Sequence, residues 1–510
     1  MGLLVFMAMT VGKWMRNFHR LALGCVALSS ASCCYLHVAD VWCRDPRSPL
    51  PPTQVGRNDA SRLYANEAEV IRVPHDPDQA TGVISATIRR ASREHRIVSV
   101  SGARHSMGGH TFTPGGLVLD ILDLNGLQLD ESRNLLHVGA GARWSEVIPY
   151  LDRRGRSVKV MQASNDFSVG GSLSVNCHGW QHNSPPIASS VEGFTLITAD
   201  GRVRHCSRQE NRELFSLALG GYGLFGVIID ADLRVVPNEF YQARSERVRS
   251  SGYLSAYRRL TAGKAAGMAY GRINPSPSLF LDDSIVTVLE RCGDDRATGH
   301  TLHPSTSSEA ALLRVKRSVF RSGLGHPDNK ELRWQLELSV GETGKKPLSR
   351  NQIMNESSDW FANRDPSRTD LLHEIFVPVK RLDDFLVRAR TIMPQHPQID
   401  LLNVTVRNVE PDHDTFLRYA REEVFGVVML FDLHRDMKSD QEMAALTRQL
   451  TDAALALGGT YYLPYRPHAT QRQFEQAYPQ AKRFAALKRH YDPQGLFDNE
   501  FWQRYGKPLE

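Results

Sequence analysis

The sequence predicts an α+β protein built from two large domains. Its 510 residues are 41% hydrophobic and 23% charged, which is typical of a globular chain with a sizeable core. Between residues 76 and 236, predicted strands alternate with short helices, and two glycine-rich loops interrupt them at 101–110 and 168–179. Residues 239–455 contain segments that could pair into a second, mainly antiparallel sheet. We therefore expect two domains with different sheets.

Charge and cysteine content argue against two kinds of site. The 62 basic and 56 acidic residues leave a net charge of +6, and no run of like charges marks a nucleic-acid-binding tail. Four of the seven cysteines lie within the first 43 residues, whereas Cys177, Cys206 and Cys292 are scattered. Scattered cysteines form no disulfide framework, and no Cys/His spacing typical of zinc is present. We expect neither a metal site nor a nucleic-acid partner.

Residues 1–43 have the pattern of a signal peptide or membrane anchor. Three basic residues lie between 13 and 20, followed by an apolar stretch at 21–41 with small residues at 29–32. The apolar stretch is just long enough to span a bilayer. A helix buried in the folded protein is the alternative. Residues 44–65 contain four prolines and are predicted to form a stiff linker. We expect the protein to be membrane-associated or exported.

The first domain is predicted to open with a helix over 76–93. Asp76 is a good N-cap, Pro77 suits the first helical position, and apolar residues follow at helical spacing. Asp200-Gly201 predicts the turn of a β-hairpin over 194–203. The other predicted elements are strands at 97–100, 117–121, 135–138 and 227–236, and helices at 145–153 and 213–219.

The two glycine-rich loops are candidates for binding a diphosphate. Glycine has no Cβ, so several backbone N–H groups can converge on one anion. An ordinary tight turn is the alternative for either loop. A third segment, residues 221–226, matches the Gly-x-Gly-x-x-Gly dinucleotide fingerprint. That fingerprint follows a strand and opens a helix, whereas here a helix precedes it and a strand follows it. We therefore do not interpret it as a Rossmann motif.

Four segments resemble, in family order, the vanillyl-alcohol-oxidase family of FAD-linked oxidoreductases, whose FAD-binding domain is of the p-cresol methylhydroxylase (PCMH) type. Residues 102–106, Gly-Ala-Arg-His-Ser, are similar to the first flavin loop, and residues 168–179 to the second. Residues 220–228 resemble the turn and strand that close the FAD domain, and residues 492–499 the segment that returns to it. The Arg-His-Ser and His-Gly features resemble the aldonolactone and alditol oxidase branch.

The resemblance implies an extended FAD whose isoalloxazine ring faces a substrate domain. It places the FAD-binding domain at 66–238, the substrate domain at 239–455 and a segment returning to the FAD domain at 456–510. In this branch the loop histidine is bonded to the 8α carbon of the flavin. His105 matches it, and a simple hydrogen bond to FAD is the alternative. His178 could bind the flavin or be a satisfied core histidine. The implied cofactor-binding residues are Gly102, Ala103, Arg104, His105, Ser106, Ser168, Gly171, Ser172, His178, Gly179 and Ile228.

The predicted substrate domain contains four segments that could form its sheet, at 332–340, 372–379, 400–408 and 424–433. The third alternates aliphatic with polar residues, so one of its faces is wholly polar. That face could be a solvated sheet surface, or a roof over the flavin that holds a hydroxylated substrate. The polar residues are Asn403, Thr405 and Arg407, and the aliphatic residues are Leu402, Val404 and Val406.

Four residues are candidates for contact with the substrate. Arg407 carries a guanidinium that could stabilise substrate oxygens or negative charge on the reduced flavin. Glu374 lies in the second predicted strand, where a surface salt bridge is its alternative role. Tyr465 and Arg466 belong to a stretch rich in hydroxyls and cations, just before the chain returns to the FAD domain.

These residues and the resemblance imply an enzyme that oxidises a CH–OH group of a sugar, aldonolactone or polyol by hydride transfer to flavin N5. Oxygen or a membrane electron carrier would then reoxidise the flavin. Two alternatives remain. One is a two-step, flavin-dependent sugar epimerase, and the other is a catalytically inactive, membrane-tethered sugar-binding protein.

Overall fold

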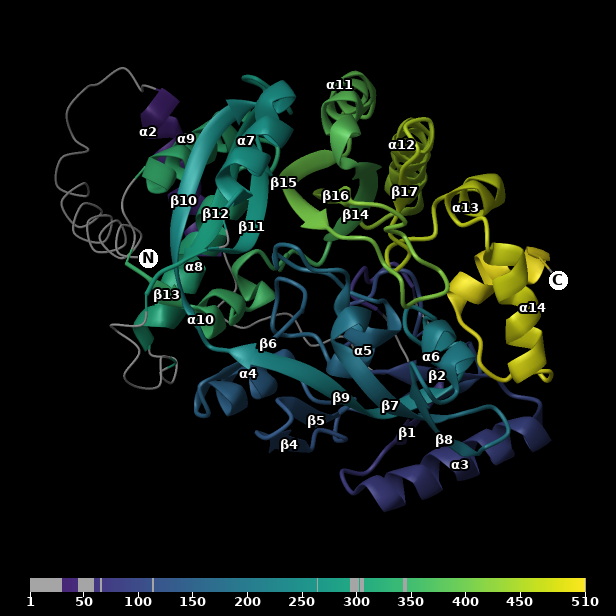
Figure 1. The fold of residues 1–510 in the computed structure, drawn as a ribbon. Helices are drawn as coiled ribbons and strands as arrows, with labels where there is room; N and C mark the ends of the chain where they lie inside the picture. Colours follow the sequence, from purple (N-terminus) through teal and green to yellow (C-terminus); the bar gives the residue numbers. More distant parts are fainter. Residues whose placement is uncertain are drawn as a thin grey trace.

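Three β-sheets and the helices around them make up the protein (Figure 1). The mixture of helices and strands confirms the predicted α+β class, and the sheet of the C-terminal half is antiparallel as expected. The computed structural model describes residues 30–44, 59–64, 67–111, 114–263, 265–293, 302, 307–342 and 346–509.

The N-terminal half of the chain builds two of the sheets. The smaller sheet is parallel, with the strand order β1-β3-β2. The larger is antiparallel, with the order β4-β5-β9-β7-β8 and with β6 paired to β9. The strands are β1 (Glu69–Arg72), β2 (Val98–Ser101), β3 (Leu117–Asp120), β4 (Leu127–Asp130), β5 (Leu135–Gly139), β6 (Arg156–Val158), β7 (Val191–Ile197), β8 (Val203–Ser207) and β9 (Val227–Pro237).

Helix α3 (Pro77–Glu94) lies under these sheets and confirms the first predicted helix (Figure 1). The carboxylate of Asp76 accepts a hydrogen bond from the backbone N–H of Gln79 at 2.9 Å, as an N-cap does. The buried side chains of α3, among them Ile84 and Ile88, recur at helical spacing. The other helices of this half are α4 (Trp144–Asp152), α5 (Val169–Ser174) and α6 (Arg212–Ala218).

The segment at 221–226 is not a Rossmann motif, as its context predicts. Helix α6 precedes it and strand β9 follows it. Its glycines allow backbone conformations that other residues rarely adopt, since Gly223 has a φ of +76° and Gly226 a φ of +144°. A Cβ on Gly226 would lie 2.5 Å from the carbonyl oxygen of Ile197, so the turn needs glycine there.

The C-terminal half forms one antiparallel sheet of eight strands, in the order β13-β10-β12-β11-β15-β16-β14-β17. Helices α7, α11 and α12 pack on this sheet (Figure 1). The strands are β10 (Phe240–Arg249), β11 (Ala266–Ile273), β12 (Asp283–Arg291), β13 (Leu348–Ser349), β14 (Arg368–Pro378), β15 (Asp400–Val409), β16 (Val424–His434) and β17 (Thr460–Tyr461). The helices are α7 (Tyr253–Thr261), α8 (Ser307–Arg321), α9 (Pro327–Glu342), α10 (Arg350–Met354), α11 (Leu382–Ile392), α12 (Met437–Leu455), α13 (Gln471–Ala477) and α14 (Ala481–Tyr491).

One predicted strand is wrong. Residues 332–340 lie inside helix α9 (Pro327–Glu342). Pro327 occupies the first position of the helix and Asp328 its first turn, both of which favour a helix start. The following residues are mostly good helix formers, including Lys330, Glu331 and Leu332. These helix-favouring residues explain why the segment forms a helix and not a strand.

The predicted alternation of the polar strand fails at one position. A β-bulge lies between Leu401 and Asn403, where β15 pairs with β16. The bulge places Leu402 in a small cluster with Phe320 and Leu430, whereas Leu401 joins the main core with Val404. Leu402 therefore does not share a face with the aliphatic residues that follow it, because the extra residue shifts the alternation by one.

The end of the chain returns to the first half of the protein. The backbone N–H of Val98 on β2 donates to the carbonyl of Leu496 at 2.6 Å, and Phe497 forms a parallel bridge with Val98. The Asn499 side chain donates to the carbonyl of Tyr222 at 2.9 Å. Strand β17, by contrast, still belongs to the eight-stranded sheet, so the return begins after Tyr461.

The predicted N-terminal segment and linker are described only in part. Of the signal or anchor at 1–43 and the linker at 44–65, residues 1–29, 45–58 and 65 lie outside the described residues. Residues 30–44 form helix α2 (Ser30–Arg44), which packs against α8 and α9. No helix in the described ranges is both long enough and apolar enough to cross a membrane.

Two deeply buried histidines predict a loss of stability in acid. Burial lowers the pKa of His110 to about 4 and that of His373 to about 3. An unfolded chain protonates histidine at a pKa of about 6.5 and therefore binds more protons than the folded protein below that pH. The free energy of unfolding should therefore fall between about pH 6.5 and pH 4, by roughly 3 kcal/mol per histidine. Urea unfolding at several pH values in this range gives the free energy of unfolding, which should fall less steeply with decreasing pH in His373→Gln than in the wild type. The same pH dependence in both proteins would contradict the low pKa of His373.

Candidate active site

A cavity of about 560 Å³ separates the two glycine-rich loops from the polar face of the eight-stranded sheet. This volume is in the range of cofactor and substrate sites in proteins. Strands β11, β14, β15 and β16 form one wall, and the chain around Tyr465 contributes to the rim. The first half of the protein supplies the opposite wall, from β2, from the loops at 102–107 and 168–178, and from the turn at 222–228.

The two loops meet through Ser168. Its hydroxyl accepts a hydrogen bond from the backbone N–H of Ala103 at 3.2 Å. A Cβ on Gly102 would collide with the Ser168 hydroxyl, and one on Gly171 would lie 3.0 Å from it. Glycine at these positions keeps backbone and hydroxyl groups close together without side chains between them. A polyanionic cofactor needs a cradle of this kind, so the loops fit the diphosphate of FAD.

Ten of the eleven predicted cofactor-binding residues line the cavity. Gly179 does not, and its Cα packs so tightly against the carbonyl of Met161 that a Cβ would have no room. Gly179 therefore lets the backbone of the second loop pack closely against Met161. The residues that line the cavity are Gly102, Ala103, Arg104, His105, Ser106, Ser168, Gly171, Ser172, His178 and Ile228.

His105 lies in the first loop and stacks on Phe167 of the second. The ring centroids are 4.3 Å apart and the planes are inclined by 21°. Burial lowers the pKa of His105, and the nearby carboxylate of Asp166 only partly offsets this effect. The imidazole is therefore neutral near pH 7, which leaves one ring nitrogen with a free lone pair.

Glu374 and His178 form a buried pair that joins the two walls of the cavity. The Glu374 side chain, on β14, is 1% exposed, and its Oε1 lies 2.7 Å from Nε2 of His178, whose side chain is 4% exposed. Burial raises the pKa of Glu374, but the charges of His178 and Arg407 and a hydrogen bond from Tyr465 outweigh it and hold the pKa below its ordinary value. Glu374 is therefore a carboxylate inside the protein.

Arg407 and Tyr465 complete this group. Arg407 donates to the carbonyl of His178 at 3.5 Å, and the Tyr465 hydroxyl donates to Oε2 of Glu374 at 3.4 Å. Burial raises the pKa of Tyr465 far above its ordinary value, so its hydroxyl keeps its proton. A carboxylate, a guanidinium and a phenol thus meet the imidazole that the second glycine-rich loop supplies. Together they can accept a proton and bind oxygen atoms.

The polar face of β15 looks into the cavity. Asn403, Thr405 and Arg407 all line it, so this face is a roof and not a solvated surface. Arg272 of β11 extends the roof and donates to the Thr405 hydroxyl at 3.0 Å. Arg272 also pairs with Glu337 of α9 through two contacts of 3.0 Å. Sequence analysis missed this ion pair, since neither residue lies in a motif and Glu337 was placed in a strand.

Arg466 lies outside the cavity, unlike the other three predicted catalytic residues. Its guanidinium donates to Asp440 of α12 at 2.6 Å and lies 4.5 Å over the ring of Tyr64. His468 also contacts Asp440, at 3.0 Å. Arg466 therefore holds the returning chain against α12. The chain forms a turn at residues 463–464 and a bend at Tyr465, and beyond it the Arg466 side chain is directed to Asp440.

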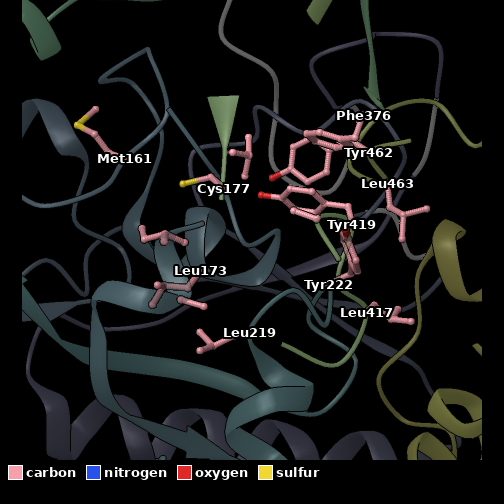
Figure 2. Close-up of a cluster of buried hydrophobic side chains, with 14 of the residues drawn as sticks. Met161, Leu173, Cys177, Leu219, Tyr222, Phe376, Leu417, Tyr419, Tyr462 and Leu463 are labelled. Atoms are coloured by element: carbon pink, nitrogen blue, oxygen red, sulfur yellow. The ribbon is translucent and has the colours of Figure 1, made fainter. Parts of the chain in front are cut away.

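An aromatic cluster joins the second loop to the eight-stranded sheet (Figure 2). The rings of Phe376 and Tyr419 stack with centroids 4.3 Å apart. The Tyr419 hydroxyl donates to the carbonyl of Asn176 at 2.7 Å, and the Tyr462 hydroxyl to that of Val175 at 2.8 Å. These contacts fix the loop beside His178. No local pattern predicted them, because the residues come from distant parts of the chain.

Cys177 packs into the same cluster (Figure 2). Burial raises the pKa of its thiol to about 12, so the side chain is a neutral, small apolar group. Within the described ranges, no group of three or more histidine, cysteine, aspartate or glutamate side chains could hold a metal ion.

Gly426 of β16 leaves the space in which the Glu374 carboxylate lies. A Cβ at this position would lie 2.8 Å from Oε1 of Glu374 and 3.0 Å from the Phe376 ring. Gly426→Ala should displace Glu374 and lower turnover by roughly 10- to 100-fold with little change in FAD content. Gly252→Ala is the control, because its Cβ would meet only Val248, at 3.7 Å. Equal turnover in Gly426→Ala and Gly252→Ala would show that the position of the Glu374 carboxylate does not affect turnover.

Two family models match the chain. Residues 70–207 match the model described as FAD binding domain, and residues 332–505 match that of D-arabinono-1,4-lactone oxidase. The first match contains both glycine-rich loops. The second contains Glu374, Arg407 and Tyr465.

Two relatives match over most of the chain at low identity. The chain is 23% identical over 445 residues to decaprenylphosphoryl-beta-D-ribose oxidase of Mycolicibacterium smegmatis, covering 83% of this chain and 92% of the relative. It is 22% identical over 464 residues to L-gulonolactone oxidase of Bos taurus, covering 87% and 96%. Cytokinin dehydrogenase 2 of Arabidopsis thaliana is 32% identical over 135 residues, 26% of this chain and 27% of that protein.

The cavity, its two glycine-rich loops and the paired family matches lead to one assignment. The chain belongs to the FAD-linked oxidoreductases that join a PCMH-type FAD-binding domain to a C-terminal region of the D-arabinono-1,4-lactone oxidase type.

Proposed function

We propose that the protein oxidises a CH–OH group of a sugar, aldonolactone or polyol. The observation that carries this proposal is the group in which Glu374, Arg407 and Tyr465 meet His178 of the second flavin loop, all four lining the cavity. The names of the relatives, which include a lactone oxidase and a ribose-derivative oxidase, support the same class of substrate. Bound FAD would supply the hydride acceptor, and the side chains of the protein would accept the substrate's proton and bind its oxygen atoms.

Each of these residues suits a separate task. Glu374 is a carboxylate and can accept the hydroxyl proton of the substrate. His178, whose Nε2 lies 2.7 Å from Oε1 of Glu374, can hold that carboxylate in place. Arg407 can hold the substrate oxygen on which negative charge develops, and Tyr465 can donate a hydrogen bond because it stays protonated. Asn403 and Thr405 offer polar groups for further hydroxyls of a sugar or polyol.

A panel of substrates tests this function. The purified yellow protein is titrated without oxygen against aldonolactones, alditols and ribose derivatives, and the flavin absorbance is recorded. We expect at least one CH–OH donor to bleach it and to yield the matching carbonyl compound. A sugar that binds without bleaching the flavin would favour the inactive sugar-binding protein. Bleaching followed by return of an inverted CH–OH compound would favour the epimerase.

Covalent attachment of FAD through His105 is part of this proposal. The neutral, buried imidazole stacked on Phe167 supports it, because a bond to the flavin would need an unprotonated ring nitrogen. Acid-precipitated wild-type protein should retain the flavin fluorescence, and His105→Ala should release all of it into the supernatant. His95→Ala is the control, since His95 is the C-cap of α3. Wild-type FAD found entirely in the supernatant would exclude the covalent bond and leave the fold assignment intact.

We also propose that the N-terminal region brings the protein to a membrane or across it, and that oxygen or a membrane electron carrier reoxidises the flavin. The basic residues before the apolar stretch at 21–41 support the first point. Full-length, uncleaved protein found only in a cytosolic fraction would contradict it.

A further inference from the structure

We propose that helix α2 (Ser30–Arg44) stays in the mature protein as a strap, which holds the α8–α9 hairpin over the cavity, and that any removable targeting segment ends at Ser29. The hairpin consists of α8 (Ser307–Arg321) and α9 (Pro327–Glu342). The inference does not depend on the proposed substrate, because it rests on contacts of the strap.

The hairpin forms part of the cavity wall. Phe320 of α8 and Glu337 of α9 both line the cavity. Phe320 meets Trp360 edge to face, with ring centroids 5.3 Å apart, and Trp360 also lines the cavity. The position of the hairpin therefore sets the shape of the space in which a substrate would lie.

The hairpin is attached to the eight-stranded sheet mainly by polar contacts. No hairpin residue that the structure describes belongs to the main hydrophobic cluster, and Phe320 joins only a small one with Leu402 and Leu430. Elements with few buried apolar contacts open more easily than core elements do. The polar contacts to the sheet include Arg272 with Glu337, Arg333 with the Leu402 carbonyl, Arg321 with Asp370 and Asp432, Lys330 with Asp400, and the buried Trp334 with Asp283.

The strap contacts the turn and both helices of the hairpin. Arg314 of α8 donates to the carbonyl of Trp42 at 2.6 Å, and its guanidinium lies 4.3 Å over the Trp42 ring. That carbonyl belongs to the last turn of α2, where carbonyls lack helical partners and a cation is favourable. His326, in the turn between α8 and α9, lies 3.7 Å from His37, centroid to centroid.

Helix α9 supplies the third contact. Asn329 donates to the carbonyl of Cys34 at 3.3 Å, and Cys34 is buried. The strap is 15 residues long, or about 22 Å, which is shorter than the roughly 30 Å core of a bilayer. Its length and its polar partners fit a helix that binds protein. Cleavage at or after residue 43 would remove all of these contacts.

The sequence offers a cleavage position that would spare the strap. Ala27 and Ser29 have the spacing of small residues that precedes the cut in export signals, and Ser30 is the first residue of α2. A cut after Ser29 would remove the basic and apolar residues before it and leave the whole strap.

Mass spectrometry of the protein from an export-competent host tests the first half of the proposal. We expect every mature, flavin-containing chain to begin at Ser30 or at an earlier residue. Mature, flavin-containing protein that begins beyond Ser30 would overturn the proposal.

Hydrogen exchange of the holoenzyme tests the second half. Arg314→Met keeps the stem of the side chain but removes its contacts with Trp42, so amide exchange in α8 and α9 should rise by about tenfold. Peptides from β1 to β9 should not change. Arg258→Met is the control, because Arg258 is an exposed arginine on α7. A chain that begins at residue 45 should show a larger rise and a higher KM with the same FAD content. If exchange in α8 and α9 stays at the wild-type rate in Arg314→Met, the strap does not hold the hairpin.

Discussion

Replacing Glu374 with glutamine should lower the rate of flavin reduction by roughly 10²- to 10⁴-fold, the usual range for the loss of a general base. The amide keeps the size of the side chain but cannot accept the hydroxyl proton of a substrate. It also leaves His178 without the carboxylate that lies 2.7 Å from its Nε2. Rapid mixing with the best substrate under anaerobic conditions measures the effect directly.

Glu290→Gln is the control for this variant. Glu290 lies on β12 of the same sheet and pairs with Arg244 at its surface, at 3.5 Å. FAD content and thermal unfolding should be compared in both variants, so that a misfolded site is not taken for a catalytic effect. If Glu374→Gln reduces its flavin as fast as the wild type does, Glu374 is not the base.

Arg407→Met should lower the same rate by one to three decades, or roughly 1.5–4 kcal/mol of transition-state stabilisation. Methionine retains the apolar stem but removes the fork of donors that faces the cavity. The flavin loops belong to the other half of the protein, so FAD content should stay close to that of the wild type. The variant also loses the contact of 3.5 Å with the His178 carbonyl.

Arg244→Met provides the comparison, because Arg244 is an arginine at the surface of the same sheet. A lower rate of flavin reduction in Arg407→Met but not in Arg244→Met supports a role of Arg407 in turnover. Equal rates of flavin reduction in the wild type and Arg407→Met would show that Arg407 lines the cavity without a role in turnover.

The parts of the site that have a local signal could be predicted from the sequence. Glycine-rich loops need particular residues at fixed spacing, so residues 102–106 were predicted as a group, and of the residues in 168–172 that line the cavity only Gly170 was missed. Strict alternation on β15 predicted that Asn403, Thr405 and Arg407 share a face, and all three line the cavity.

The errors arose where local patterns were ambiguous. A β-bulge next to Leu402 has no reliable signal in a single sequence, and it moved that side chain to the other face. Residues 332–340 were predicted as a strand, although Pro327 and Asp328 open a helix before them. Arg466 was assigned to the site from its neighbourhood in sequence, whereas its side chain binds Asp440.

Contacts between distant residues were beyond the reach of sequence patterns. Glu374 and His178 were each candidates, but nothing in the sequence indicated that their side chains pair at 2.7 Å. The same holds for Arg272 and Glu337, which come from β11 and α9. Such pairs follow from the way the eight-stranded sheet covers the loops.

Single-turnover reduction with a deuterated donor tests the central claim most directly. The protein is mixed without oxygen with its best CH–OH substrate, carrying hydrogen or deuterium on the carbinol carbon, and the flavin absorbance is followed. We predict complete bleaching, one carbonyl product per flavin and a slower rate with deuterium, because the C–H bond breaks as hydride leaves. Flavin that stays oxidised with every CH–OH donor would contradict the account.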